Sequence, residues 1–166
     1  VNAYDAIFTC EKELVDKHEK IHFCFAGSNL PWISVDNYKI YDKTKLISFI
    51  ASSKKMCRGH KIRHELYEKV KDQIDVYGTI TGVPFGHRPG CHIQGNPDNR
   101  WHDKLEGLND YMFSVVMEND MYETWFSEKI TDCFATGTVP VYWGPKSIGD
   151  YFNTEGIIFL EGSIED

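Results

Sequence analysis

The chain has 166 residues, of which 42% are hydrophobic and 26% charged, a composition that excludes a disordered protein. Its length is close to the roughly 150 residues of one domain, so we expect a single core. The formal net charge of -7 argues against a general nucleic-acid binder, because the average surface repels a phosphate backbone. An anionic ligand therefore needs a local basic pocket.

Apolar runs alternate with helical patterns along the chain. The predicted strands are residues 4–8, 21–26, 46–51, 74–78, 111–117, 139–143 and 157–160. The predicted helices are residues 11–18, 60–73, 102–109 and 127–136. Strands that alternate with helices in this way predict an α/β fold.

The predicted helix 60–73 has the amphipathic pattern of a helix that packs on a sheet. Its apolar face carries Ile62, Leu66, Tyr67 and Val70. Residues 79–103 are polar, rich in Gly and Pro, and show no convincing period, so we expect a long loop or lid there.

The ends of the chain predict that it is a fragment. It opens directly into the first strand without a start methionine, and it stops soon after strand 157–160 with no helix to cover that strand. We therefore expect missing flanks.

Several patterns bear on location. The cysteines are odd in number and widely scattered, which favours a reducing compartment over a disulfide framework or a zinc site. They are Cys10, Cys24, Cys57, Cys91 and Cys133. No apolar run approaches the roughly 20 residues of a membrane span, and there is no signal-peptide pattern. We expect a cytoplasmic protein without an integral membrane segment, with peripheral membrane association open for a full-length protein.

The first strand-to-helix junction of interest follows strand 46–51. Small residues, among them Ser52, give way to clustered cations as the helix begins, and Arg63 lies in that helix. A helix N-terminus together with a guanidinium suits a diphosphate. From charge alone, a solvated basic turn is the commoner explanation.

The second junction follows strand 111–117 and gives a stronger signal. A short helix can start at Ser127 as its cap, bury one face (Ile130, Cys133 and Phe134), and end at Gly137. Glu128 and Lys129 then lie in its first turn, where a carboxylate can accept ribose hydroxyls and an ammonium can meet phosphates. A cation there opposes the helix dipole, which an anionic ligand would explain.

The residues of this second junction resemble a known family. Glu118-Asn119, then Ser127-Glu128-Lys129-Ile130, then Thr138 to Gly144 (T-V-P-V-Y-W-G) resemble the donor motif of family 10 glycosyltransferases, the α1,3/α1,4-fucosyltransferases. Residues 50–54 and 61–67 look like that family's strand and arginine-bearing helix. The resemblance covers roughly residues 45–160.

The resemblance implies an inverting enzyme of GT-B architecture, with an N-terminal acceptor domain and a C-terminal domain that binds GDP-fucose. This chain resembles the C-terminal half, a Rossmann-like, mostly parallel sheet with helices on both faces. We expect residues 1–166 to form a single donor-binding domain, in which residues 1–40 include the tail of, or the linker from, the acceptor domain. The implied partners are a nucleotide-sugar donor and a glycan acceptor, and not nucleic acid.

By position, the resemblance implies that Arg63 and Lys129 hold the diphosphate and that Glu128 binds the ribose hydroxyls. Trp125 would line the donor pocket, and Asn119 would lie near the sugar or phosphates.

Two further positions belong to the implied donor-binding set. Ser52 matches the family's first strand end. The bacterial pattern of the family usually has tyrosine at the position of Trp125, so a phenolic hydroxyl is missing there, and Tyr122 is the candidate to compensate for it.

The implied reaction displaces a nucleoside diphosphate by an acceptor hydroxyl, so negative charge builds on the departing phosphate. Arg63 and Lys129 can stabilise that charge in place of a metal, and the chain has no D-x-D sequence. We expect no metal and no cofactor beyond the GDP-fucose donor. Glu118-x-Asp120 is interpreted as loop acids, and His87, Cys91 and His92 as loop residues, with a lid role for these three left open.

No catalytic residue is assigned within the chain. The resemblance places the general base, a carboxylate, in the acceptor domain. Two alternatives stay open: transfer from another nucleotide-sugar, and a non-catalytic nucleotide-binding α/β module.

Overall fold

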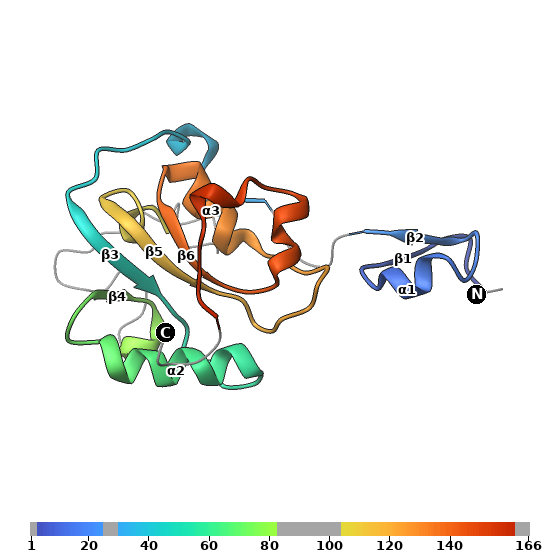
Figure 1. The fold of residues 1–166 in the computed structure, drawn as a ribbon, viewed down its shortest axis with the longest axis horizontal. Helices are drawn as coiled ribbons and strands as arrows, with labels where there is room; N and C mark the ends of the chain where they lie inside the picture. The colour runs from blue at the N-terminus through green and yellow to red at the C-terminus, as the bar shows by residue number, and fades with distance from the viewer. Residues whose placement is uncertain (1–2, 25–29, 83–103, 162–166) are drawn as a thin grey trace.

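The computed structural model describes residues 3–24, 30–82 and 104–161. Its main feature is a five-stranded, wholly parallel sheet in the order β4-β3-β5-β6-β7 (Figure 1). The strands are β3 (Lys45–Ile50), β4 (Asp75–Tyr77), β5 (Tyr111–Met117), β6 (Val139–Trp143) and β7 (Ile158–Phe159). The predicted α/β fold is confirmed.

The strand order reverses direction beside β3. The chain passes from β3 outward to β4 and then returns to place β5 on the other side of β3. In open α/β sheets such a switch point leaves a crevice beyond the carboxyl ends of the two strands, where ligands bind. The topology therefore marks the ends of β3 and β5 as the place to look for a site.

Two helices cover opposite faces of this sheet, α2 (Arg58–Val70) and α3 (Glu128–Thr136) (Figure 1). Successive residues of a strand point to opposite faces. Accordingly, Val115 packs in the cluster that includes the apolar side of α2, and Val116 packs in the cluster that includes Ile130 and Cys133 of α3. The predicted apolar stripe of α2 (Ile62, Leu66, Tyr67 and Val70) is confirmed.

Residues before the main sheet form a small parallel sheet of their own (Figure 1). It contains β1 (Ile7–Thr9) and β2 (Ile21–Phe23), joined by the one-turn helix α1 (Lys12–Val15). The predicted strand 4–8 and helix 11–18 are thus present but shorter or shifted. The assignment of residues 1–40 to a domain boundary stays a prediction.

The predicted helix 102–109 is wrong where it is described. Residues 105–107 form a single 3-10 turn. A helix cannot continue there because the chain at Gly107 is held against the sheet: its carbonyl accepts a 2.6 Å hydrogen bond from the Ser48 hydroxyl. A Cβ at Gly107 would lie 2.9 Å from the Ile50 side chain. Of the predicted loop 79–103, Thr79–Thr81 form a 3-10 turn. Residues 83–103 lie outside the described residues.

Helix α3 ends as predicted but begins differently. Gly137 adopts the left-handed conformation (φ 65°) that ends the helix. Ser127 stands at the capping position without making a side-chain cap bond, because its hydroxyl is committed to Glu118. Phe134, which we expected to be buried, is 36% exposed, and its ring packs against Phe152.

Two other expectations concern cysteines and membranes. Of the predicted unpaired cysteines, Cys10, Cys24, Cys57 and Cys133 are free. Cys91, together with His87 and His92, lies outside the described residues. Among the helices that the structure describes, none is long and apolar enough to cross a membrane.

Candidate functional site

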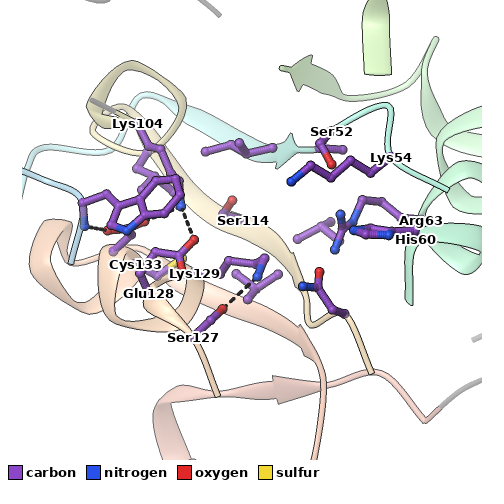
Figure 2. A pocket seen from close by; sticks show the side chains of 18 of the residues that line it. Ser52, Lys54, His60, Arg63, Lys104, Ser114, Ser127, Glu128, Lys129 and Cys133 are labelled. Atoms are coloured by element: carbon purple, nitrogen blue, oxygen red, sulfur yellow. Dashed lines mark hydrogen bonds and ion pairs between the residues drawn. The ribbon is translucent and has the colours of Figure 1, made fainter. Parts of the chain in front are cut away.

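A cavity of about 630 Å³ opens at the carboxyl ends of β3 and β5, between the starts of α2 and α3 (Figure 2). This is the switch point of the sheet. Six of the seven residues predicted from the sequence to bind the donor line it: Ser52, Arg63, Asn119, Trp125, Glu128 and Lys129. The seventh, Tyr122, is 58% exposed and is not among the described residues that line the cavity.

Arg63 is only 4% exposed, and its guanidinium is held by a main-chain carbonyl of β5. Its Nη2 donates a 2.8 Å hydrogen bond to the carbonyl of Met117, the last residue of β5. Burial lowers the pKa of the guanidinium, and the nearby Glu118 acts in the opposite direction. Arginine stays protonated under such conditions, so Arg63 is a fixed positive charge at the cavity wall.

Lys129 is held by a buried carboxylate. Glu118 is 0% exposed, and its Oε2 accepts a 3.2 Å bond from the Lys129 ammonium. The same oxygen accepts from the Ser127 hydroxyl at 2.7 Å, and Oε1 accepts from the Ser127 main-chain N–H at 2.9 Å. Ser127 Oγ in turn accepts from Lys129 at 2.8 Å. Glu118 thus fixes the start of α3 and orients its lysine.

Glu128 has a partner of opposite charge that the sequence did not reveal. The Lys104 ammonium donates to Glu128 Oε1 at 3.1 Å and to Asp132 Oδ2 at 2.7 Å. Although burial works against its charge, the two carboxylates raise the pKa of Lys104. Trp32 contacts both of these partners. Its main-chain N–H donates to Asp132 Oδ1 at 2.6 Å, and Lys104 Nζ lies 4.4 Å from the centroid of the Trp32 ring.

Trp32, Lys104 and Asp132 all line the cavity and were missed from the sequence. Asp132 carried one usable signal, because it lies one helical turn after Glu128 and therefore on the same face. Trp32 and Lys104 are brought to α3 from distant positions, and no local pattern marks them.

Helix α2 is docked directly on the end of β5. The Gly59 N–H donates to the Asn119 carbonyl at 2.8 Å. A Cβ at Gly59 would lie 2.0 Å from the Glu118 carbonyl oxygen, so only glycine allows this approach. The close contact sets where Arg63, one turn further along α2, enters the cavity.

His60 adds a neutral group near the cations Arg63 and Lys54. It is 5% exposed, and its Nδ1 accepts a 3.2 Å bond from the Met56 N–H and lies 3.0 Å from Cys57 Sγ. Burial lowers the pKa of His60, and the positive charges of Arg63 and Lys54 lower it further. The imidazole is therefore neutral at pH 7.

Trp125 supplies part of the apolar wall of the cavity. Its indole Nε1 is buried and, within the described ranges, has no hydrogen-bond partner. The side chain of Trp125 therefore contributes an apolar surface to the cavity, while its indole nitrogen is buried.

The cavity is electrostatically divided. Figure 2 shows Ser52, Lys54, His60 and Arg63 at one end and Lys104 and Glu128 at the other, with Ser127 and Lys129 between them. Paired cations from two helices at a sheet switch point are suited to a diphosphate. Among the described residues, no group of three or more His, Cys, Asp or Glu side chains is arranged to hold a metal ion.

Comparisons with known proteins show which family this chain resembles. Residues 40–154 match the family described as Glycosyltransferase family 10 (fucosyltransferase) C-term. An α-(1,3)-fucosyltransferase FucT of Helicobacter pylori is 34% identical over 116 residues, which are 70% of this chain and 21% of that protein. An α-(1,4)-fucosyltransferase of Arabidopsis thaliana is 28% identical over 71 residues, 42% of this chain and 18% of that protein.

A solved α1,3-fucosyltransferase structure shares the fold. It superposes with a TM-score of 0.55 at 18% identity, covering 97% of this chain and 53% of that one. This confirms the predicted fold class, a parallel α/β domain like that of a GT-B fucosyltransferase. The chain spans about a fifth of the length of the curated relatives above. On the family match, this chain belongs to the C-terminal domain of glycosyltransferase family 10, the fucosyltransferases.

Proposed function

We propose that this protein binds GDP-fucose in the cavity and transfers the fucose, with inversion, to a hydroxyl group of a glycan acceptor. One observation carries the proposal: Arg63 and Lys129, from helices on opposite faces of the sheet, line the same cavity at the switch point. Fucose is the sugar that family membership favours, since the relatives are named fucosyltransferases.

The diphosphate would occupy the end of the cavity that holds Arg63. A guanidinium has five N–H donors in a planar fork, and the Met117 carbonyl engages Nη2, so other donors can meet phosphate oxygens. Lys129 is partly exposed, with 23% of its side chain accessible, so its ammonium can reach a ligand while Glu118 holds it.

Both cations would act most strongly as the bond to the sugar breaks, because charge then develops on the departing diphosphate. They are fixed by Met117 and Glu118 before the ligand arrives, so little reorganisation is needed at that moment. We propose that this fixed pair replaces a divalent metal.

Glu128 would accept a bond from a ribose hydroxyl. Inversion also needs a general base that removes the acceptor proton as the new bond forms. We propose that this base is a carboxylate outside this chain, in the part of the enzyme that binds the acceptor.

A transfer assay tests the proposal. The enzyme containing this chain is incubated with GDP-fucose, UDP-galactose or ADP-glucose and a panel of oligosaccharide acceptors, with and without EDTA, and the product is examined by NMR. We expect transfer from GDP-fucose only, unaffected by EDTA, with an inverted anomeric configuration. The Arg63→Ala variant should be strongly impaired, while Lys61→Ala, an exposed cation on the same helix, serves as the control.

Each other outcome points to a different correction. Preference for another nucleotide-sugar would show that GDP-fucose is not the donor. Retention of the anomeric configuration would show that the reaction is not inverting. Loss of activity in EDTA that added Mg²⁺ or Mn²⁺ restores would show that a metal takes part. Nucleotide binding without transfer to any acceptor would favour a non-catalytic module.

A further inference from the structure

We propose that Trp32 forms a nucleoside-binding subsite, in which its indole ring packs against the base of the nucleotide, at the end of the cavity that lies opposite Arg63. The inference rests on the proposed function, since it assigns the second half of the same ligand. Trp32 lies outside residues 40–154, the part of the chain that matches the family.

The charges of the cavity orient the ligand. At the Arg63 end, Lys54 and Arg63 are cations that line the wall, and His60 is neutral. At the other end, the single charge of Lys104 is shared by two carboxylates, Glu128 and Asp132, so that end carries a net negative charge. A phosphate is attracted to the first end and repelled from the second, and the uncharged nucleoside is left for the second.

Trp32 is fixed in a way that suits a stacking surface. Its main-chain N–H is bonded to Asp132, and the Lys104 ammonium lies 4.4 Å from the ring centroid. The side chain nevertheless lines the cavity and is 37% exposed. A large aromatic that is held in place and still accessible loses little conformational entropy when a base packs on it.

The neighbouring carboxylate completes the subsite. Within the described ranges, Lys104 is the side-chain partner of Glu128 and bonds Oε1, which leaves Oε2 for a ribose hydroxyl. Figure 2 shows Lys104 and Glu128 on the same side of the cavity. The nucleoside subsite thus consists of Trp32 for the base and Glu128 for the ribose, with Lys104 and Asp132 as positioning residues for both.

The test separates the nucleoside from the phosphates. The dissociation constants of GDP and of inorganic pyrophosphate are measured by calorimetry for the wild type, Trp32→Ala and Trp32→Phe. Because stacking of a base on an aromatic side chain contributes on the order of tenfold in affinity, we expect Trp32→Ala to weaken GDP about tenfold. Pyrophosphate binding should not change, and Trp32→Phe should restore most of the GDP affinity.

The controls exclude a purely structural effect. Trp32→Ala keeps the main-chain bond to Asp132, and its unfolding midpoint is measured without ligand. Tyr38→Ala removes another exposed aromatic ring nearby in the chain, outside the cavity, and should leave both constants unchanged.

Two results would overturn the subsite alone: equal losses of GDP and pyrophosphate affinity in Trp32→Ala, or no loss of either. If the wild type binds pyrophosphate and GDP equally well, the base makes no contact and the inference is also wrong. If the wild type binds neither, the proposed function fails and the subsite fails with it.

Discussion

Each charged residue that opens α3 is paired with a buried or nearly buried group of opposite charge. Glu128 is held by Lys104, and Lys129 is held by Glu118. Such pairs fix the geometry of the side chains before a ligand arrives, which is the condition under which charged groups act most effectively on a ligand. The pairs also make the stability of the fold depend on the site.

The Lys129–Glu118 pair predicts non-additive effects on stability. Lys129→Met leaves the buried Glu118 carboxylate without its cation, so we expect the free energy of unfolding to fall by about 1–3 kcal/mol. Glu118→Gln in the same chain should recover part of that loss, because it removes the uncompensated charge. Urea denaturation of both single variants and the double variant measures the coupling.

A matched control is Lys146→Met, whose ion pair with Glu161 is exposed on both sides and should contribute little to stability. Strictly additive losses at Lys129 and Glu118 would contradict the interpretation that one residue acts through the other.

The environment of His60 predicts that the stability of the fold depends on pH. Burial and neighbouring cations lower the pKa of His60 in the folded state from its ordinary value of 6.5. As the pH falls below 6.5, the unfolded chain therefore binds more protons at this residue than the folded chain does. Stability from neutral His60 is therefore full above pH 6.5 and is lost as the pH falls, by up to about 1.4 kcal/mol per pH unit.

The free energy of unfolding is measured by denaturation between pH 7.5 and pH 5, roughly the range in which histidine titrates, and its slope against pH is compared between the wild type and two variants. His60→Gln should flatten part of the slope, since a glutamine oxygen can still accept the Met56 N–H bond. His22→Gln, at the exposed residue of β2, should keep the slope of the wild type. An unchanged slope in His60→Gln would show that the imidazole is not held neutral.

At the scale of elements, the site depends on how closely α2 approaches β5. Gly59 permits this approach, and Arg63 follows it on the same helix. Gly59→Ala places a Cβ within 2.0 Å of a main-chain oxygen, which a shift of the helix must relieve. We expect a loss of about 3 kcal/mol in stability and weaker GDP binding, because Arg63 moves with the helix.

Denaturation and calorimetry of Gly59→Ala are compared with Gly156→Ala, where an added Cβ meets nothing within 4 Å. Equal stability and equal GDP affinity in the two variants would show that the contact between α2 and β5 does not set the site.

The sequence predicts the elements better than their ends. The unit β5-α3-β6 was predicted because its strands are apolar runs and its helix has clear periodicity and a terminal glycine. Helix 102–109 was predicted wrongly, because the bond from Ser48 to the Gly107 carbonyl is a tertiary contact that no local pattern reveals. The role of Ser127 changed for the same reason, since Glu118 engages its hydroxyl.

At the scale of the whole molecule, the sequence located the cavity because ligand positions in parallel sheets lie at strand-to-helix junctions. Arg63 and Lys129 belong to such junctions, and both line the cavity. Trp32 and Lys104 do not, and they reach α3 only through the fold. The residues at strand-to-helix junctions, Glu128 among them, were therefore predictable from local pattern, whereas Trp32 and Lys104, which lie beside Glu128 and Asp132, were not.

We propose that the fixed cations of this domain bind a nucleoside diphosphate without a metal. Calorimetric titration of the purified protein with GDP in the presence of EDTA, for the wild type and for Arg63→Ala, tests this proposal. We expect GDP binding by the wild type that EDTA leaves unchanged, and binding at least about tenfold weaker in Arg63→Ala. Binding that requires added Mg²⁺ or Mn²⁺, or that survives the loss of Arg63 intact, would contradict it.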